Sequence, residues 1–510
     1  MAPRYYTTPI YYVNGDPHIG HAHTTVMGDI LKRLNLMRGD DTFYSTGTDE
    51  HGQKNQEAIE KSGMDAEIYL SKLSDRFREL FDRLNIQYDC YIRTTFESHK
   101  TVVTKVLAHL HEKALIYKKD YTGLYCVGCE QFKKESDLDG HGNCPDHQRP
   151  PIKQTETNYF FKISLFQDWL KKWLMSDDNL IQPLFYRNEV LAMLVEPLED
   201  LCISRPKSRV WLGIELPFDT DYVTYVWFDA LLNYITNVGY GISSDFDKWW
   251  NNSIHLMAKD IIKTHIIYWP IMLKAIDVAP PSRFRIHGYW VGEGGQKMAK
   301  SLGNVIEPND MIDLVGPDGF RFYLAKSMGG TDAQISKALV LSTYNTDLAN
   351  NLGNLHSRVV KFVDKRFAGR VPPKTRTFPE DRALQEYVAE KANETVMNCD
   401  LISIPNLIAT SLEIADRLNL YFNDAAPWKM VKIEEEKERV HSVLYAMLDC
   451  LRMLFELLTP VIPETASKAL VSLGSKPVGV AAARHTFLPD GLRQHATFGE
   501  IVDLFPRIDN

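Results

Sequence analysis

Residues 5–47, YYTTPIYYVNGDPHIGHAHTTVMGDILKRLNLMRGDDTFYSTG, decide which fold is expected. The segment from Tyr5 to Ile10 is β-branched and aromatic, which predicts a strand, and Asn14-Gly15 predicts the turn after it. The segment from Thr42 to Thr46 has the same character and predicts a second strand, which Gly47 should end before a further helix.

A helix is expected between these two strands. Asp16 can cap it with Pro17 at its first position, and the helix should run to Arg38 and stop at Gly39. This alternation of strands and helices predicts an α/β fold with a doubly wound, Rossmann-like parallel sheet. In such folds ligands bind where the strands end and the helices begin.

Changes of pattern along the 510 residues predict several domains, since one compact core rarely grows to this size. We expect a catalytic domain in two parts, residues 1–114 and 222–288, separated by an inserted domain at residues 115–221 that is rich in aromatic residues and cysteines. Residues 289–345 should hold a glycine-rich, lysine-bearing loop. Residues 346–510 should form an all-α domain.

The expected helix bundle rests on apolar residues that recur at helical spacing. Similar stripes lie at Leu412–Phe422 and Val440–Leu458, and each predicts one buried helix face. The first stripe consists of Leu348, Leu352, Leu355, Val359 and Phe362.

The composition is that of a globular protein, with 44% hydrophobic and 24% charged residues. Charges break the apolar runs before they reach a membrane-spanning length, and the first ten residues lack a signal-peptide pattern. We therefore expect a cytoplasmic protein with no membrane partner. The net charge of −8 gives no indication of DNA binding, although cations exceed anions in residues 346–375, either as a solvated helix face or as a nucleic-acid contact.

The tetrapeptide His18-Ile19-Gly20-His21 stands at the start of the first expected helix. A helix N-terminus presents unpaired N–H groups that suit phosphate, and the two imidazoles add donors. Gly20 lets an adenine or ribose approach the backbone closely. Taken alone, the histidines could equally bind a metal or pack.

The segment Lys297-Met298-Ala299-Lys300-Ser301 follows the glycine-rich stretch Gly288–Gly295. Two lysines on a loop can follow a triphosphate and stabilise the charge that develops as pyrophosphate leaves. By itself this segment is equally well explained as a basic surface loop.

Together, the two motifs resemble the signatures of class I aminoacyl-tRNA synthetases. Ala299 stands where that family commonly has serine, and activity is expected to survive the change. The resemblance assigns catalysis to His18, His21, Lys297 and Lys300. It assigns binding of ATP, with Mg²⁺, to these residues together with Gly20, Asp260 and Ser301.

Three further segments resemble the methionine-specific synthetases, of the bacterial type with a single zinc knuckle. They are TPIYYVNG at residues 8–15, GTDEHG at residues 47–52 and YVWFDA at residues 225–230. The resemblance spans essentially the whole chain and ends without the optional carboxy-terminal oligomerisation domain, so a monomer is expected. It implies methionine, ATP and tRNA(Met), the initiator included, as partners.

These residues make sense as a methionine site, because a thioether is polarisable and favours aromatic walls. Asp49 is expected on the substrate ammonium, and Arg205 near the substrate or the phosphates. Core packing alone would also explain the aromatic residues, and helix capping would explain Asp49. The expected aromatic walls are Tyr12, Trp227, Tyr234 and Trp269. Around them we expect Ile10, Ala230, Leu231, Ile261 and, closing the pocket, His265.

The inserted domain contains the pattern Cys126-x2-Cys129-x14-Cys144-x2-His147. Two ligand pairs on tight turns favour a tetrahedral, structural zinc site, and buried thiols are the alternative. His141 competes with His147, although its spacing from Cys144 is less regular. The resemblance points to the same four ligands, three cysteines and one histidine.

In the helical part, Asn354 and Arg358 are four residues apart and project from one helix face. Trp428 follows Pro427, which suits a rigid, exposed aromatic residue. Amide, guanidinium and indole groups provide the edge hydrogen bonds and the stacking surface that an unstacked RNA base needs. The three positions resemble the anticodon readers of the family.

The implied reaction is the ATP-dependent ligation of methionine to its tRNA through a methionyl-adenylate. Three alternatives stay open at this point: another class I synthetase, a small-molecule nucleotidyltransferase, and a non-catalytic RNA-binding paralogue. The chain has no room for the editing insertion of the branched-chain enzymes. A nucleotidyltransferase would leave the helix bundle and the zinc pattern without a role.

Overall fold

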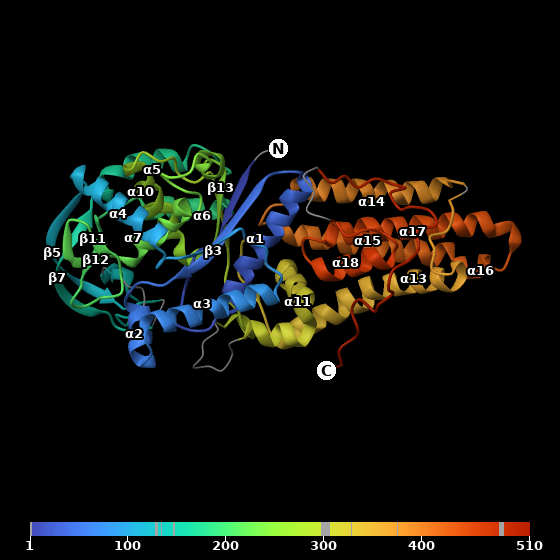
Figure 1. Cartoon of the computed structure of the whole chain (residues 1–510), viewed down its shortest axis with the longest axis horizontal. Coiled ribbons are helices and arrows are strands. Elements are labelled where there is room, and N and C mark those ends of the chain that lie inside the picture. The colour runs from blue at the N-terminus through green and yellow to red at the C-terminus, as the bar shows by residue number, and fades with distance from the viewer. Residues whose placement is uncertain are drawn as a thin grey trace.

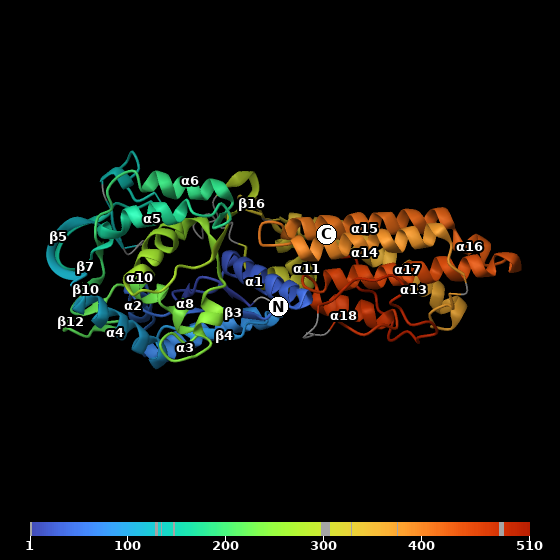
Figure 2. The ribbon, with the colours of Figure 1, turned by 90° about the horizontal axis from the view of Figure 1, so that it is seen from above.

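The computed structural model describes residues 3–127, 131–133, 135–145, 148–296, 306–327, 329–374, 376–478 and 484–509. It has an α/β lobe and a helical lobe, with helices α1 (Ile19–Arg38) and α11 (Pro308–Ser327) between them (Figure 1). The view from above shows the same arrangement (Figure 2). Five predicted site residues lie outside the described ranges: Cys129, His147, Lys297, Lys300 and Ser301.

A seven-stranded sheet with parallel pairings forms the centre of the α/β lobe, in the order β2-β3-β1-β13-β14-β8, with β4 also paired to β3. This confirms the predicted fold class. Helices lie on both sides of the sheet, as the connections between parallel strands require. The strands are β1 (Arg4–Thr7), β2 (Tyr11–Tyr12), β3 (Thr42–Asp49), β4 (Cys90–Arg93), β8 (Ile181–Gln182), β13 (Ser253–Ala258) and β14 (Arg283–His287).

The first helix begins two residues later than predicted, because His18 and not Asp16 is its N-cap. The His18 side chain accepts a hydrogen bond from the N–H of Gly20, and His21 accepts one from the N–H of His18. The two histidines thus form a reciprocal capping box. The predicted stop is confirmed, since Gly39 closes α1 with a φ of 78°.

The first strand is shorter and the second longer than predicted. β1 ends at Thr7, because Pro9 has no N–H with which to continue the ladder, and Tyr11–Tyr12 then pairs with β3 as a separate strand. β3 runs through Gly47 to Asp49. Gly47 does not end the strand. A Cβ there would lie 2.1 Å from the carbonyl oxygen of Ile92, so glycine allows β4 to approach.

The inserted region carries two smaller sheets beside the main one. A four-stranded antiparallel sheet has the order β6-β5-β7-β9, and a three-stranded sheet has the order β10-β12-β11. Their strands are β5 (Ile116–Cys126), β6 (Gln131–Lys133), β7 (Ile152–Phe161), β9 (Leu201–Cys202), β10 (Ser204–Pro206), β11 (Glu215–Leu216) and β12 (Asp219–Thr224). A short parallel pair, β15 (Trp290–Val291) with β16 (Ala333–Gln334), leads towards the helical lobe.

The remaining helices follow the chain from one lobe to the other, and no helix among the described residues is long and apolar enough to cross a membrane. Those of the α/β lobe are α2 (Gln53–Ser62), α3 (Ala66–Arg83), α4 (Glu97–Glu112), η1 (Glu135–Asp137), η2 (Ile163–Phe166), α5 (Gln167–Leu174), α6 (Leu184–Met193), α7 (Val226–Leu231), α8 (Asn233–Thr236), α9 (Phe246–Trp250), η3 (Lys259–Ile261), η4 (Lys263–Tyr268) and α10 (Trp269–Ala275). After η5 (Glu293–Gly295) and α11 come α12 (Lys337–Thr343), η7 (Tyr344–Gly353), α13 (Asn354–Phe367), α14 (Pro379–Asn398), α15 (Ile404–Ala425), α16 (Pro427–Met430), η8 (Glu434–Glu436), α17 (Lys437–Leu458) and α18 (Pro463–Ser472).

The predicted helix bundle is confirmed, but one of its helices differs from the prediction. Every residue of α17 from Ser442 to Leu458 is buried, so this helix is enclosed on all sides and not on one face. It packs against α14, α15 and α18, which explains why it is apolar all round. The first predicted stripe crosses from the π-helix η7 into α13, and Phe362 at its end is only half-buried.

Candidate active site

The N-terminus of α1 presents two stacked imidazole rings. The ring centroids of His18 and His21 are 3.6 Å apart. The Nδ1 of His18 accepts the N–H of Gly20 at 3.1 Å, and the Nδ1 of His21 accepts the N–H of His18 at 3.1 Å. The rings of Tyr11 and Phe77 pack against His21. The sequence motif therefore becomes a rigid turn at the amino end of a helix.

This hydrogen bonding assigns the tautomers. Because both Nδ1 atoms accept, a neutral His18 and a neutral His21 each carry the ring proton on Nε2 and can donate it. Burial, and next the neighbouring His18, lower the pKa of His21 well below its usual value. The turn thus combines free helix N–H groups with neutral donors, an arrangement suited to phosphate oxygens.

Four of the predicted pocket residues form one cluster beyond the carboxyl end of β13. The hydroxyl of Tyr234 donates to the Nε2 of His265 at 2.8 Å, since the Nδ1 of His265 faces the carbonyl oxygen of Ile261 at 3.0 Å. The ring of Trp227 meets the ring of His265 edge to face at 6.1 Å, and Trp269 lies 5.9 Å from Tyr234. Burial lowers the pKa of His265 to about 4, so this imidazole is neutral near pH 7.

Asp49 and Tyr12 approach the same cluster from the main sheet. The two residues are partners in the register of β2 and β3, so they lie side by side where both strands end. The side chain of Asn55 donates to the backbone carbonyl of Asp49 at 2.8 Å. Burial chiefly raises the pKa of Tyr234 well above its usual value, and the charge of Asp49 contributes in the same direction. A buried carboxylate therefore lies within electrostatic reach of the aromatic cluster.

The other residues predicted for this site differ in exposure. Leu231 is 2% exposed and packs in the hydrophobic core, as Phe228 does. Asp260 is exposed, on the short helix η3 that follows β13. Arg205 is buried, with its guanidinium 4.7 Å from the ring centre of Tyr225. Ala230 is buried, whereas Ile10 and Ile261 are half-buried.

A buried network around Asp229 was missed in the sequence. One oxygen of Asp229 bonds the Nδ1 of His51 at 2.5 Å, and the other bonds the Nε2 of His99 at 2.6 Å. Burial alone would raise the pKa of Asp229, but the two imidazoles, His51 foremost, hold it at about 2. The network ties the GTDEHG segment to the YVWFDA segment. Both segments were recognised, but their pairing across 178 residues has no local signal.

A second network orients the indole of Trp269. Its N–H donates to the Nε2 of His255 at 3.0 Å, so the proton of His255 is on Nδ1, which donates to the hydroxyl of Thr7 at 2.7 Å. Burial, and next the neighbouring His265, lower the pKa of His255 well below its usual value. The aromatic wall is therefore anchored to β1 through a neutral histidine.

Two of the four predicted zinc ligands are described, and each lies on a tight turn. Cys126 ends β5 and pairs with Gln131 of β6, and Cys144 forms an isolated bridge with Arg149. Both cysteines are buried. Among the described residues no group of three or more histidines, cysteines, aspartates or glutamates could hold a metal ion. His141 is exposed, and its N–H donates to Asp139.

The structure brings the three residues predicted to read RNA to one end of the helical lobe. Asn354 is exposed one turn before Arg358 on α13. The guanidinium of Arg358 lies 5.5 Å from the ring centre of Phe422, and the Trp428 ring meets the same phenyl ring at 5.6 Å. Trp428 is 38% exposed. Phe422 thus supports both side chains, and the name reading face is used below for Asn354, Arg358 and Trp428.

The cations of residues 346–375 form less of a positive patch than their sequence indicates. Lys361 pairs with Asp503 at 2.9 Å and Lys374 with Asp490 at 2.5 Å, both aspartates coming from the distant carboxy-terminal segment. Tertiary contacts therefore offset part of the local positive charge.

Known proteins share this arrangement. The sequence model of a family described as tRNA synthetases class I (M) matches residues 4–151 and 146–360. The methionine–tRNA ligase of Clostridium tetani is 40% identical over 509 residues, which cover 99% of this chain and 78% of the ligase. The ligase of Streptomyces coelicolor is 36% identical over 99% of this chain and 96% of its own length.

Solved structures give the same result. Mycobacterium tuberculosis methionyl-tRNA synthetase in complex with methionyl-adenylate superimposes with a TM-score of 0.93 and 32% identity, covering 99% of this chain and 100% of that one. The free form of that synthetase has a TM-score of 0.86 at 29% identity, covering 100% of this chain and 99% of that chain. The likeness therefore includes both lobes.

Proposed function

The chain belongs to the class I methionyl-tRNA synthetases, which join methionine to tRNA through an adenylate, and we propose which of its residues perform each step. The observation that carries this proposal is the placement of Asp49 beside the neutral cluster of Tyr234, His265 and Trp227, close to the carboxyl ends of the central strands. The alternatives left open by the sequence are set aside by the family membership.

In the first step the methionine carboxylate attacks the α-phosphorus of ATP. A carboxyl–phosphate bond forms, the bond to the β-phosphate breaks, and pyrophosphate leaves with its bound Mg²⁺. No general base is needed, because the carboxylate is already ionised near pH 7. The step depends on orientation and charge stabilisation.

His18 and His21 donate from Nε2 to the phosphate oxygens during this step. Their neutral state suits the role, since a neutral donor at a helix N-terminus is held in place by its capping bonds and gains no proton near pH 7. Lys297 and Lys300 neutralise the departing pyrophosphate. Asp260 binds the ribose at the exposed edge of the site.

Methionine binds with its ammonium on Asp49 and its thioether between Trp227, Tyr234 and Trp269. A buried ammonium requires a charged partner, and the aromatic rings offer a polarisable wall to sulfur. The fixed tautomer of His265 presents a neutral edge to the thioether, which disfavours charged side chains in the pocket.

In the second step a hydroxyl of the terminal tRNA ribose attacks the adenylate carbonyl. An ester forms, the bond between the carboxyl group and phosphate breaks, and AMP leaves. The reading face selects the tRNA by stacking an anticodon base on Trp428 and bonding base edges with Asn354 and Arg358.

Cys126, Cys129, Cys144 and His147 are proposed to hold one structural zinc. The two described cysteines are buried on separate tight turns, which is how a zinc knuckle presents its ligand pairs. A bound zinc would join these turns without an open position for chemistry. Metal analysis should find one zinc per chain, and its removal by a chelator should loosen the β5–β6 region without unfolding the helical lobe.

Methionine-dependent ATP–pyrophosphate exchange tests the site. The chain should support exchange with methionine alone, and Asp49→Asn should lower kcat/KM for methionine roughly 10²- to 10³-fold, because an unpaired buried charge costs about 3–5 kcal/mol. Asp41→Asn, which removes an exposed carboxylate paired with Lys248, is the matched control. An Asp49→Asn enzyme as active as the control would exclude Asp49 from the ammonium site.

A further inference from the structure

The side chain of Arg321 is fully buried at the junction of the two lobes. Its Nη2 donates to the carboxylate of Asp29 at 2.7 Å and to the carbonyl of Pro460 at 2.7 Å. Its Nε donates to the carbonyl of Val461 at 2.8 Å, and its Nη1 to that of Leu84 at 2.9 Å. One guanidinium therefore bonds three chain segments that are far apart in sequence.

The position of this ion pair relates it to both catalytic motifs. Asp29 is on α1, the helix that begins at the His18–His21 turn. Arg321 is on α11, which begins at Pro308, a few residues after the lysine motif in the chain. The pair thus joins the two helices that follow the two motifs.

The helical lobe takes part through the turn between α17 and α18. Pro460 and Val461 of that turn accept the other Arg321 bonds, and the N–H of Thr465, in the first turn of α18, donates to Asp318 of α11 at 2.6 Å. A shift of the helical lobe therefore acts directly on α11 and on its partner Asp29.

The carboxyl half of α1 has further contacts with the helical lobe. The Nε of Arg38 donates to the carbonyl of Val396 on α14 at 2.6 Å, and the N–H of His485 donates to the carbonyl of Met37 at 2.8 Å. The amino end of α1, which carries the imidazoles, belongs to the active site. α1 is therefore one rigid element with an end in each lobe (Figure 1).

Directional bonds at this point have a consequence that apolar packing lacks. Asp29 is also fully buried and accepts from the N–H of Gln87 at 2.8 Å and from the Nε of Arg33 at 2.8 Å. A buried ion pair adds little net stability compared with apolar residues of the same volume, but its bonds set one register between the helices. Register is what two motifs on separate helices need, since small displacements of catalytic groups cost large factors in rate.

We propose that Asp29 and Arg321 are positioning residues for the transfer to tRNA: they relay the engagement of the helical lobe to the His18–His21 turn. This proposal rests on the proposed function of the reading face. Methionine activation without tRNA does not need the relay, whereas charging of a tRNA with the matching anticodon does.

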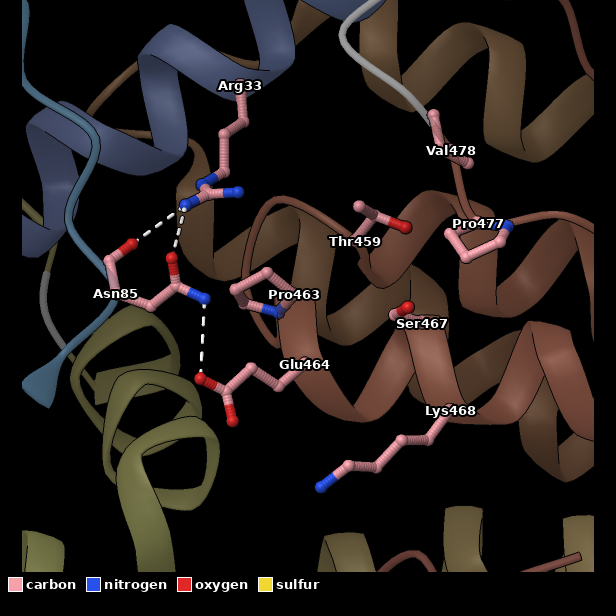
Figure 3. A pocket seen from close by; sticks show the side chains of 9 residues that line it. All are labelled: Arg33, Asn85, Thr459, Pro463, Glu464, Ser467, Lys468, Pro477 and Val478. Carbon is pink, nitrogen blue, oxygen red and sulfur yellow. Dashed lines mark hydrogen bonds between the residues drawn. The ribbon is translucent and has the colours of Figure 1, made fainter. Parts of the chain in front are cut away.

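A cavity beside the pair offers an independent way to disturb the relay. Its volume is about 500 Å³, and it separates α1 and the chain after α3 from α18 (Figure 3). Arg33 and Asn85 line one wall, joined by hydrogen bonds of 2.7 and 3.3 Å, and Ser467 of α18 lines the other. Ser467→Phe would wedge α18 away from α1 without touching Asp29 or Arg321.

The test measures three rates with the full chain: pyrophosphate exchange without tRNA, charging of tRNA with a CAU anticodon, and charging of the same tRNA with another anticodon. For the unaltered chain the ratio of the two charging rates measures anticodon coupling. In Asp29→Asn and Arg321→Lys this ratio should fall roughly tenfold, within the 5- to 150-fold range of such couplings, while exchange changes less than about twofold.

Asp381→Asn is the matched control, because Asp381 is equally buried and ion-paired with Arg439 at 2.6 Å, but wholly inside the helical lobe. It should leave the ratio unchanged. If exchange and both charging rates fall together in Asp29→Asn, the pair is only structural and the proposal is overturned. A retained ratio in Asp29→Asn overturns it as well.

Ser467→Phe decides the outcome if the ion-pair variants fail to fold. It should lower the ratio at least about threefold with exchange retained, and an unchanged ratio would overturn the proposal. Failure of the proposed function itself has a different signature. In that case the unaltered chain would show no methionine-dependent exchange, or no preference for CAU.

Discussion

The two lobes bury different kinds of residue. In the α/β lobe His23, His255, His265 and His287 are each 1–3% exposed. In the helical lobe the centre is α17, which is enclosed and mostly apolar from Ser442 to Leu458. The polar recognition residues of the first lobe are therefore inside, and those of the second, the reading face, are at the surface.

The difference follows from the size of what each lobe is proposed to bind. A methionine side chain can be enclosed, so its walls are held by hydrogen bonds such as that between Tyr234 and His265. An RNA base attached to its backbone stays outside, so Trp428 is held by a single aromatic contact with Phe422 and remains exposed. Enclosure demands a polar interior in one lobe, and the other can keep an apolar one.

Acid should separate the two lobes most strongly. Burial lowers the pKa of His265 and of His287 to about 4, below the value of about 6.5 of an unfolded chain. The unfolded state thus binds more protons between these values, so the stability is complete above pH 6.5 and is lost as the pH falls to about 4. Each histidine contributes on the order of 3 kcal/mol at the lower limit.

Hydrogen exchange followed by lobe between pH 7 and pH 4.5 measures this effect. Peptides of the α/β lobe should lose protection first, because the helical lobe has one comparable group, His356, whose pKa burial also lowers to about 4. Asp229, with its pKa near 2, should contribute only at lower pH, as the pH falls from about 4 to 2. Earlier loss of protection in the helical lobe would contradict the comparison.

Trp428→Ala should separate the lobes by function. Loss of a stacking surface costs about 1–3 kcal/mol, so kcat/KM for charging should fall roughly 10- to 100-fold while pyrophosphate exchange is unchanged. Trp211→Ala is the matched control, since Trp211 is 42% exposed on the α/β lobe. Equal effects of the two substitutions on charging would remove Trp428 from the reading face.

Tyr234→Phe should have the smallest effect and the opposite distribution. It removes the bond to His265, worth about 1 kcal/mol, so the methionine KM in exchange should rise about fivefold, and charging should change only through methionine binding. Tyr387→Phe removes a comparable bond to Glu413 in the helical lobe and should leave the KM unchanged. A KM unaltered by Tyr234→Phe would show that the hydroxyl does not orient the pocket.

Local patterns predicted most of the fold. The glycine that ends α1, the central strands and the helical spacing of the bundle were all readable, because each depends on the backbone preferences of neighbouring residues. The main local error was the start of α1. His18 and His21 cap it in place of Asp16, since a histidine ring at this position can accept backbone N–H groups.

The sequence by itself determined the motifs and therefore the family, because those residues are contiguous or regularly spaced. Only the tertiary structure decided that Asp229 joins His51 and His99, and that Arg321 joins Asp29 across 292 residues. Such pairs depend on how strands and helices cross in space. No pattern of neighbouring residues encodes that crossing, so the groups that hold the site together appeared only in the folded chain.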